Sequence, residues 1–354
     1  MRRFVALLFL YALVKCPAQP AAAPTSQILA QARDLVAAHQ LEKANELLSS
    51  LIESDPKNLP ALLALGNVQQ MQALHDDAMK SFEAVLAVEP NSQPARDGEV
   101  KAAIAAALLE RGMGQNDYAL IDLERARKFV PDSPELLKDF GIQAESMRIF
   151  ADADTALLKA HELAPNDPTI LYALAHVETD EQKTADAEAH LRAYLKMRPN
   201  DASAHYGLAL VLHMLARNDE AKVELDRTVA LQPAQSESYY LLGQIAQELQ
   251  QNSEAIADYQ KVLAYAPAHG GALAELGLLS YRAKDYPAAE KYLKDAILYA
   301  PDYPAAHQYY AMLLAHQGRQ EESEKELALA RGLREQQNKQ RHGYTVKIVP
   351  QPAP

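Results

Sequence analysis

The chain has 354 residues, and its 47 acidic and 35 basic side chains give a formal net charge of −12 at pH 7. A surplus of negative charge of this size excludes nucleic acid, and a strongly anionic membrane surface, as expected partners. The one cysteine, Cys16, has no partner within the chain for a disulfide.

The amino-terminal segment, residues 1–18, has the pattern of a signal peptide. Two arginines precede an apolar run over residues 4–14, which is too short to span a bilayer. Cleavage after Ala18 would be followed by a linker rich in proline and alanine over residues 19–24. In the alternative, Cys16 is the acylated residue of a lipoprotein, and only then do we expect attachment to a membrane.

None of the ten asparagines begins an Asn-x-Ser/Thr site, which favours a bacterial periplasm over a eukaryotic secretory route. We therefore predict an exported protein that is periplasmic or secreted.

Prolines recur along most of the remaining chain at intervals of 34 residues, with one interval of 41. They are Pro56, Pro90, Pro131, Pro165, Pro199, Pro233, Pro267 and Pro301. An alanine stands twelve residues before each of them: Ala44, Ala78, Ala119, Ala153, Ala187, Ala221, Ala255 and Ala289. A period of this length is typical of helix-turn-helix units that stack into a solenoid.

Residues 270–303 show the pattern within one repeat. Apolar residues recur at steps of three and four in both halves, which predicts two amphipathic helices. The small residues Gly277 and Ala289 let the helices approach closely, and Leu293 fills the space beside them. Pro301 then ends the second helix because it has no N–H and clashes with the preceding turn.

With this period and these positions, the chain resembles the tetratricopeptide repeat (TPR) family. The resemblance implies an all-α fold, a right-handed superhelical solenoid of helix-turn-helix repeats whose concave surface holds a protein or peptide. The predicted repeats are residues 25–58, 59–92, 93–133, 134–167, 168–201, 202–235, 236–269, 270–303 and 304–337. In the last repeat Ser323 and Glu335 replace the alanine and the proline, as expected of a polar capping repeat. Residues 338–354 form a basic tail that contains prolines.

The third repeat, residues 93–133, is irregular, because seven residues have been added between Pro90 and Ala119. Counted forward from Pro90, the apolar positions of its first helix hold Arg96 and Glu99. The addition either lengthens the helix or lengthens the linker before it. It serves as a protrusion or hinge for a partner, or is a tolerated insertion at a turn.

Catalytic chemistry is not expected. The eleven histidines include no HExxH pair, there is no second cysteine, and no nucleophile elbow is present. His205 and His307 occupy positions that are apolar in other repeats, so we expect them to be packed. We predict a protein that is not an enzyme and that has no catalytic residues, metal site or cofactor.

A second face of each first helix carries the candidate binding residues. Tyr172, Tyr206 and Tyr240 recur at 34-residue steps, and the resemblance implies that their face lines the concave surface. The predicted groove residues are Tyr172, His176, Tyr206, Leu210, His213, Tyr240, Gln244 and Tyr281. Their rings and hydroxyls would suit an extended peptide that contains proline or is otherwise apolar, including the tail of a second copy. In the alternative, the tyrosines pack between helices and fill space.

These features predict an exported scaffold or adaptor that holds a protein or peptide in cell-envelope assembly or in the organisation of protein complexes. Two alternatives remain open at this point. One is an architectural envelope protein that associates through its convex face or its ends, and the other is the recognition subunit of an envelope enzyme.

Overall fold

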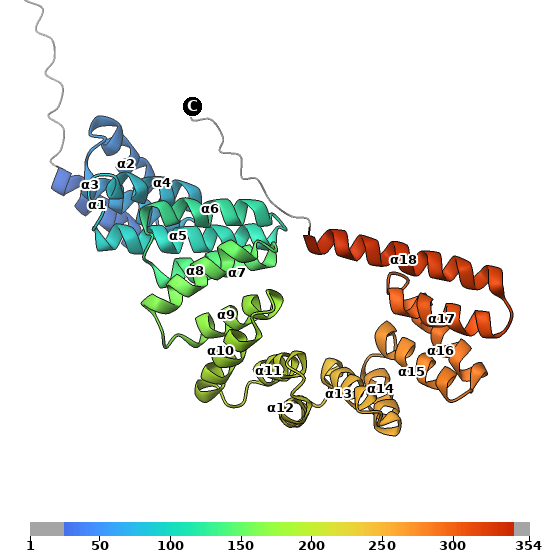
Figure 1. Ribbon diagram of the computed structural model, residues 1–354. Helices are drawn as coiled ribbons and strands as arrows, with labels where there is room; N and C mark the ends of the chain where they lie inside the picture. Colours follow the sequence, from blue (N-terminus) through green and yellow to red (C-terminus); the bar gives the residue numbers. More distant parts are fainter. Residues whose placement is uncertain (1–24, 343–354) are drawn as a thin grey trace, which may run out of the picture. The chain divides into compact units, whose positions relative to one another are not determined.

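The computed structural model describes residues 25–342, and all regular elements in this range are α-helices (Figure 1). The predicted signal peptide, the linker and the last twelve residues of the tail lie outside the described residues. The chain divides into two compact units, one ending at Ala105 and the other beginning at Ala106.

The helices follow one another in pairs. The first unit contains α1 (Thr25–Ala37), α2 (Leu41–Ser54), α3 (Leu59–Met71), α4 (His75–Leu86) and the beginning of α5 (Gln93–Gly112). The second contains the end of α5, α6 (Asn116–Phe129), α7 (Pro134–Ser146), α8 (Phe150–Leu163), α9 (Pro168–Asp180), α10 (Thr184–Met197), α11 (Ala202–Met214), α12 (Asn218–Leu231), α13 (Ser236–Glu248), α14 (Asn252–Tyr265), α15 (Gly270–Arg282), α16 (Tyr286–Tyr299), α17 (Pro304–His316) and α18 (Gln320–His342).

The periodic prolines set the ends of the second helices. In α12, for example, Leu231 is the last helical residue, and Gln232 leaves helical geometry with φ −137° and ψ 81° before Pro233. This follows because a proline disfavours helical geometry at the residue before it. Several first helices begin at a capping side chain: the N–H of Leu136 donates to Ser133 Oγ (3.3 Å), and that of Thr169 to Asp167 Oδ1 (2.8 Å).

Each turn from a first to a second helix contains one residue in the left-handed region, with φ between 56° and 76°. These residues are His39, Ala73, Gly114, Arg148, Gln182, Ala216, Gln250, Lys284 and Gly318. In the turn after α3, the N–H of Leu74 donates to the carbonyl of Gln69 (2.9 Å), a bond that closes the end of the helix. Glycine adopts this geometry most easily, yet seven of the nine positions hold other residues, so the left-handed residues could not be predicted from glycine positions in the sequence.

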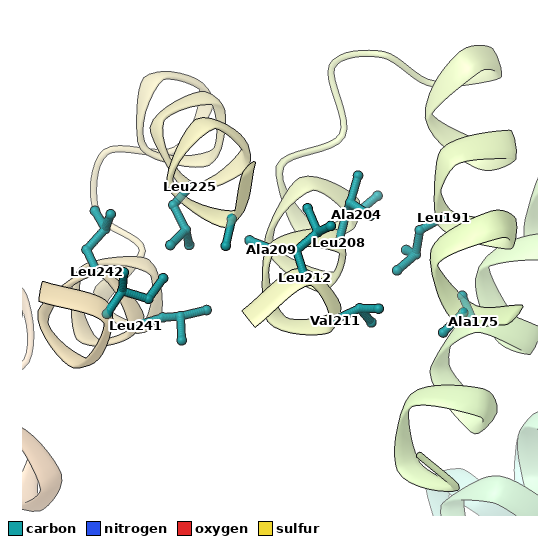
Figure 2. Close-up of a cluster of buried hydrophobic side chains, with 13 residues drawn as sticks. Ala175, Leu191, Ala204, Leu208, Ala209, Val211, Leu212, Leu225, Leu241 and Leu242 are labelled. Atoms are coloured by element: carbon teal, nitrogen blue, oxygen red, sulfur yellow. The ribbon is translucent and has the colours of Figure 1, made fainter. Parts of the chain in front are cut away.

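The core lies between the helices of each pair and between successive pairs. The eight periodic alanines are all fully buried. At Gly141 an added Cβ would lie 2.5 Å from Leu157 Cγ, which confirms that small residues there permit close helix contact. In the second unit, side chains from α9 to α13 meet in one apolar cluster (Figure 2).

The seven added residues of the third repeat lengthen α5, which has 20 residues where the other first helices have 13. In its first half, an added Cβ on Gly98 would lie 2.5 Å from Phe82 Cε1 of α4, so this half packs on the preceding pair. Seven residues are about two helical turns, so both halves of α5 present the same face.

The prediction that a charged residue occupies a core position of α5 is confirmed in its first half, where Glu99 is fully buried and Val100 is buried beside it, whereas the half in register with Ala119 has only alanines at these positions. Counted backward from Ala119, those positions are Ala103, Ala106 and Ala107, which are all buried. Counting forward from Pro90 and backward from Ala119 therefore gives two sets of mostly buried positions, seven residues apart on the same face of one long helix.

The last pair departs from the others where the sequence does. Ser323 replaces the periodic alanine, is buried, and its Oγ donates to the Ala311 carbonyl (2.8 Å). Because Glu335 stands in place of the proline, α18 continues to His342.

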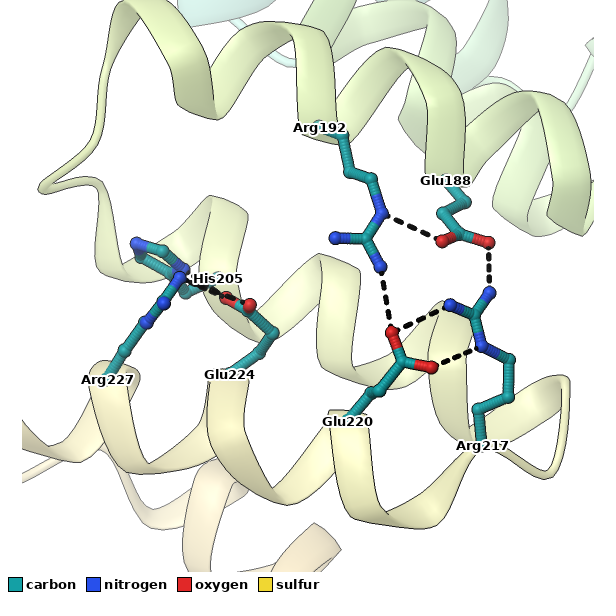
Figure 3. A network of polar contacts seen from close by, with 7 residues as sticks. All are labelled: Glu188, Arg192, His205, Arg217, Glu220, Glu224 and Arg227. Carbon is teal, nitrogen blue, oxygen red and sulfur yellow. Dashed lines mark hydrogen bonds and ion pairs between the residues drawn. The ribbon is translucent and has the colours of Figure 1, made fainter.

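A closed set of ion pairs joins the second helices α10 and α12 (Figure 3). Arg192 contacts Glu188 (2.8 Å) and Glu220 (3.2 Å), and Arg217 contacts the same two carboxylates at 2.6 and 2.7 Å. Each pair is partly exposed and weak alone, but alternating charges in a closed set leave no member uncompensated.

The two histidines at the apolar position are packed, as predicted. His205 places one ring nitrogen 2.5 Å from Glu224 Oε2 (Figure 3) and the other 3.0 Å from the Pro199 carbonyl. His307 makes the equivalent contacts with Glu326 (2.6 Å) and Pro301 (2.9 Å). The histidines therefore tie the proline turns between repeats to the following second helices.

Candidate functional site

A groove between α9 and α11 of the second unit is the candidate site. It has a volume of about 230 Å³. Its lining, which we call the α9–α11 groove, consists of Tyr172, Ala175, His176, Thr179, Asp180, Leu191, Ser203, Tyr206, Gly207, Leu210 and Gln235. Four of the eight predicted groove residues are among them: Tyr172, His176, Tyr206 and Leu210.

The groove depends on the small residue Gly207. An added Cβ there would meet only Leu191, at 3.5 Å, which is an ordinary van der Waals contact. The equivalent position of the next repeat holds Leu241, which is 3% exposed and packs in the cluster of Figure 2. A glycine at this position therefore leaves a hollow where the next repeat places a packed leucine.

The two groove tyrosines are partly buried. The Tyr172 ring centroid lies 5.2 Å from that of Tyr194 and 5.5 Å from that of His176. Burial raises the pKa of the Tyr172 hydroxyl, and the negative charges of Asp201 and Glu145 raise it further. The Tyr172 ring thus packs against two neighbouring rings, and the same residue contributes to the groove lining.

Tyr206 has a similar environment. Burial raises the pKa of its hydroxyl, and the charge of Glu237 adds to the effect. The neighbouring Tyr194 hydroxyl donates to Asp201 Oδ2 (2.6 Å), and burial with this bond raises the pKa of Tyr194 to about 12. The charges of Asp201, Glu145 and Glu237 therefore all act on the tyrosines of the groove.

His176 lies at the edge of the groove and pairs with the preceding repeat. Its Nδ1 is 3.2 Å from Glu145 Oε1 of α7. This hydrogen bond, together with the charges of Glu145 and Asp180, raises the pKa of His176 above its ordinary value of 6.5, although burial opposes the shift.

Tyr240, the third tyrosine of the predicted ladder, lies in a packed cluster outside the groove lining. Its ring centroid is 4.8 Å from that of His269 and 5.7 Å from that of Tyr259. Its hydroxyl is 3.4 Å from the Tyr303 hydroxyl and would lie 2.9 Å from a Cβ on Gly271. At this position the tyrosine fills space between helices.

The other three predicted residues also lie outside the α9–α11 groove. His213 has Nδ1 3.0 Å from Asn218 Oδ1, at the turn into α12. Tyr281 packs beside Tyr286 and His316, with ring centroids 6.0 and 6.1 Å away. Gln244 is partly exposed on α13.

The sequence analysis missed a buried polar network in α13 to α17. Glu275, 8% exposed, accepts hydrogen bonds from Gln247 Nε2 (3.0 Å) and the Tyr309 hydroxyl (3.3 Å). The Tyr259 hydroxyl donates to Gln247 Oε1 (3.1 Å). Burial raises the pKa of Glu275, and the two hydrogen bonds oppose this. The sequence signal for this network was Glu275 itself, a carboxylate at the repeat position that Gly207 and Leu241 occupy in the two preceding repeats.

The first unit has a hollow at the same repeat positions. The α1–α3 groove has a volume of about 380 Å³ and is lined by Leu29, Ala32, Arg33, Val36, Leu48, Pro60, Leu63, Ala64, Asn67, Val68 and Met71. Ala64 stands at the position of Gly207, whereas Leu29 and Leu63 replace Tyr172 and Tyr206. The two grooves are therefore formed by equivalent positions of the repeat, but the α1–α3 groove is lined mainly by aliphatic side chains and the α9–α11 groove contains tyrosines.

Within residues 25–342 no group of three or more His, Cys, Asp or Glu side chains is arranged to hold a metal ion. In the same range, no helix is both long enough and apolar enough to cross a membrane.

Comparison with known proteins connects the repeat pattern to a family. Two tetratricopeptide repeat models match the sequence, one over residues 35–107 and 178–245 and the other over 240–297 and 276–338. No curated protein matches the sequence significantly.

Solved structures resemble the chain at low identity. A chain of the APC/C hetero-tetramer Cut9–Hcn1 aligns with a TM-score of 0.54 and 16% identity, over 82% of this chain and 56% of that one. MamA (residues 41 to the end) from Desulfovibrio magneticus RS-1 aligns with a TM-score of 0.46 and 21% identity, over 48% and 97%. A tetratricopeptide repeat protein from Parabacteroides merdae ATCC 43184 gives 0.38 and 19%, over 68% and 92%. From the paired helices, the small residues at their contacts and the two family models, we conclude that the chain belongs to the tetratricopeptide repeat family.

Proposed function

We propose that the protein is an exported scaffold that binds an extended segment of a partner protein in the α9–α11 groove. Family membership supports a role in protein interactions, because repeats of this kind generally bind protein partners. The partner would lie across the first helices of two successive repeats, where Tyr172 and Tyr206 supply ring faces and hydroxyls.

The observation that carries the proposal is the hollow at Gly207. A packed first-helix face would leave no room for a side chain, as at Leu241 in the next repeat. Here the small residue leaves about 230 Å³ beside two partly buried tyrosines. A concave, largely apolar site with a few polar groups is the usual setting of a binding site.

A Gly207→Leu substitution tests the proposal by filling the groove with the residue that the next repeat already uses. The variant should fold at least as well as wild type, because the site has room and leucine favours a helix more than glycine. We would introduce a photo-crosslinking residue at Ser203 and identify the crosslinked partner from native cells by mass spectrometry.

The matched control is Ala64→Leu, which fills the equivalent position of the α1–α3 groove. Loss of the crosslinked partner in Gly207→Leu, with retention in Ala64→Leu and an unchanged circular dichroism spectrum in both, is the expected result. Equal capture by wild type and Gly207→Leu would show that partners bind elsewhere.

The proposed location, the bacterial cell envelope, is supported by the sequence of residues 1–18. Intact mass measurement of the protein from its native cells should give a chain that begins at Gln19. A mass that includes Met1, or a lipid on Cys16, would overturn cleavage after Ala18.

A further inference from the structure

We propose that the α9–α11 groove recognises a cationic side chain, that of arginine or lysine, on the bound segment. This inference rests on the proposed function and specifies its ligand. It differs from the proline-containing or apolar peptide that the tyrosine ladder alone suggested, because the structure adds the charges around the rings.

The groove combines aromatic rings with negative charge. Tyr172 and Tyr206 both line the groove, and an aromatic face attracts a cation within about 6 Å of its centroid. The acidic groups that act on the two tyrosines are Asp201 and Glu145 at the first and Glu237 at the second. Each of these acids already has a partner: Asp201 accepts from the Tyr194 hydroxyl, Glu145 pairs with His176, and Glu237 lies 3.4 Å from His269. They add to the negative potential at the groove, and the direct contacts of a cation must come from the rings and from other acceptors.

Hydrogen-bond acceptors at the groove are still available. Asp180 lines the groove and is exposed, and its carboxylate makes no hydrogen bond or ion pair with any described residue. The Oε1 atom of Gln235 is buried and has no hydrogen-bond partner within residues 25–342. A guanidinium or ammonium group supplies donors for both, and a buried acceptor without a partner is costly to leave unpaired.

His176 is the only basic side chain in the described lining of this groove. Its ring nitrogen faces Glu145 of α7 at 3.2 Å, so any positive charge it carries is compensated by the preceding repeat. The chain as a whole, with a net charge of −12, also favours the approach of a basic segment.

The α1–α3 groove provides an internal contrast. At the equivalent positions it has Leu29 and Leu63 in place of the tyrosines and Arg33 in place of His176. Without aromatic faces, and with a fixed cation at its edge, it should not take an arginine or lysine side chain.

The test uses the purified full chain, labelled with carbon-13 in its tyrosine rings, and synthetic peptides of the form acetyl-Ala-Pro-Ala-Xaa-Ala-Pro-Ala-amide. Xaa is arginine, lysine, citrulline, norleucine or glutamate. Citrulline keeps the shape of arginine without its charge. The ring signals of Tyr172 and Tyr206 are assigned with Tyr→Phe variants, and their shifts are followed as each peptide is added.

We expect the arginine and lysine peptides to shift both rings and to bind roughly five- to tenfold more tightly than the citrulline and norleucine peptides. Asp180→Asn should weaken arginine binding about threefold and leave citrulline binding unchanged. High salt should weaken the arginine peptide selectively. Gly207→Leu should abolish the shifts, and Ala64→Leu should preserve them.

Citrulline or norleucine binding as tightly as arginine would overturn the cation proposal. So would a preference for glutamate, an Asp180→Asn variant with unchanged arginine affinity, or no shift of either ring with any peptide. If norleucine binds and Gly207→Leu blocks it, the groove still binds peptides and only the cationic specificity fails. The crosslinking experiment decides the proposed function independently.

Discussion

Two glycines in first helices, Gly141 in α7 and Gly207 in α11, should respond in opposite ways to replacement by alanine. Alanine is more favourable than glycine in a helix interior by about 0.5 to 1 kcal/mol, and this gain applies to both sites. The sites differ in the space that awaits the new methyl group.

At Gly207 the added Cβ would lie 3.5 Å from Leu191 Cδ2, so Gly207→Ala should keep the full gain. At Gly141 it would lie 2.5 Å from Leu157 Cγ and 2.9 Å from its Cδ2. Leu157 is 0% exposed and Cγ is a branch point, so the side chain cannot turn away without moving its neighbours. Overpacking of this kind costs about 1 to 3 kcal/mol, and after the helix gain of about 0.5 to 1 kcal/mol this leaves Gly141→Ala destabilised by up to about 2.5 kcal/mol.

Native-state hydrogen exchange suits the measurement, because an array of repeats need not unfold in a single step. Amides of α8 should exchange faster in Gly141→Ala, and amides of α11 should exchange more slowly in Gly207→Ala. Thermal melts followed by circular dichroism should shift in the same directions. If Gly141→Ala is as stable as wild type or more stable, the helices separate at little cost and close contact does not explain the glycine.

Glu275→Gln should be more stable than wild type at neutral pH. Because the folded pKa of Glu275 is raised, the wild type loses stability as pH rises above about 4.5. Chemical denaturation at several pH values should therefore show a free energy of unfolding that depends less on pH in the variant. His176 stabilises the fold through its hydrogen bond with Glu145, and because its folded pKa is raised, this stabilisation is full below pH 6.5 and is lost as pH rises through the raised pKa. In Glu145→Gln, an NMR titration should show the His176 pKa closer to its ordinary value, and an unchanged titration would rule out that hydrogen bond. His205→Leu should cost about 2 kcal/mol, because Glu224 loses its hydrogen bond to the His205 ring and keeps only its ion pair with Arg227 (3.2 Å). Urea denaturation of the double variant with Glu224→Met should give a loss smaller than the sum of the two single losses, and additive losses would argue against the pair.

The sequence by itself determined the helix pairs and their close contacts. A proline ends a helix through its own missing N–H, and a stripe of apolar residues at steps of three and four selects one face, so both signals are local. For this reason the positions of Ala289, Gly277 and Pro301 suffice to predict a repeat, and the packing of His205 and His307 could be inferred from the positions they share with leucine.

Only the tertiary structure decided which first-helix residues share a site. Tyr172, Tyr206 and Tyr240 are equivalent in sequence, yet the first two line a groove and the third is packed against His269. The difference depends on residues of neighbouring helices, because the space beside a side chain is set by what faces it. The same reason explains why the sequence left open whether the third repeat has a longer helix or a longer linker. A seven-residue addition preserves the helical face, and only the contact at Gly98 together with the burial of Glu99 and Ala107 shows that the added turns lie within one packed helix.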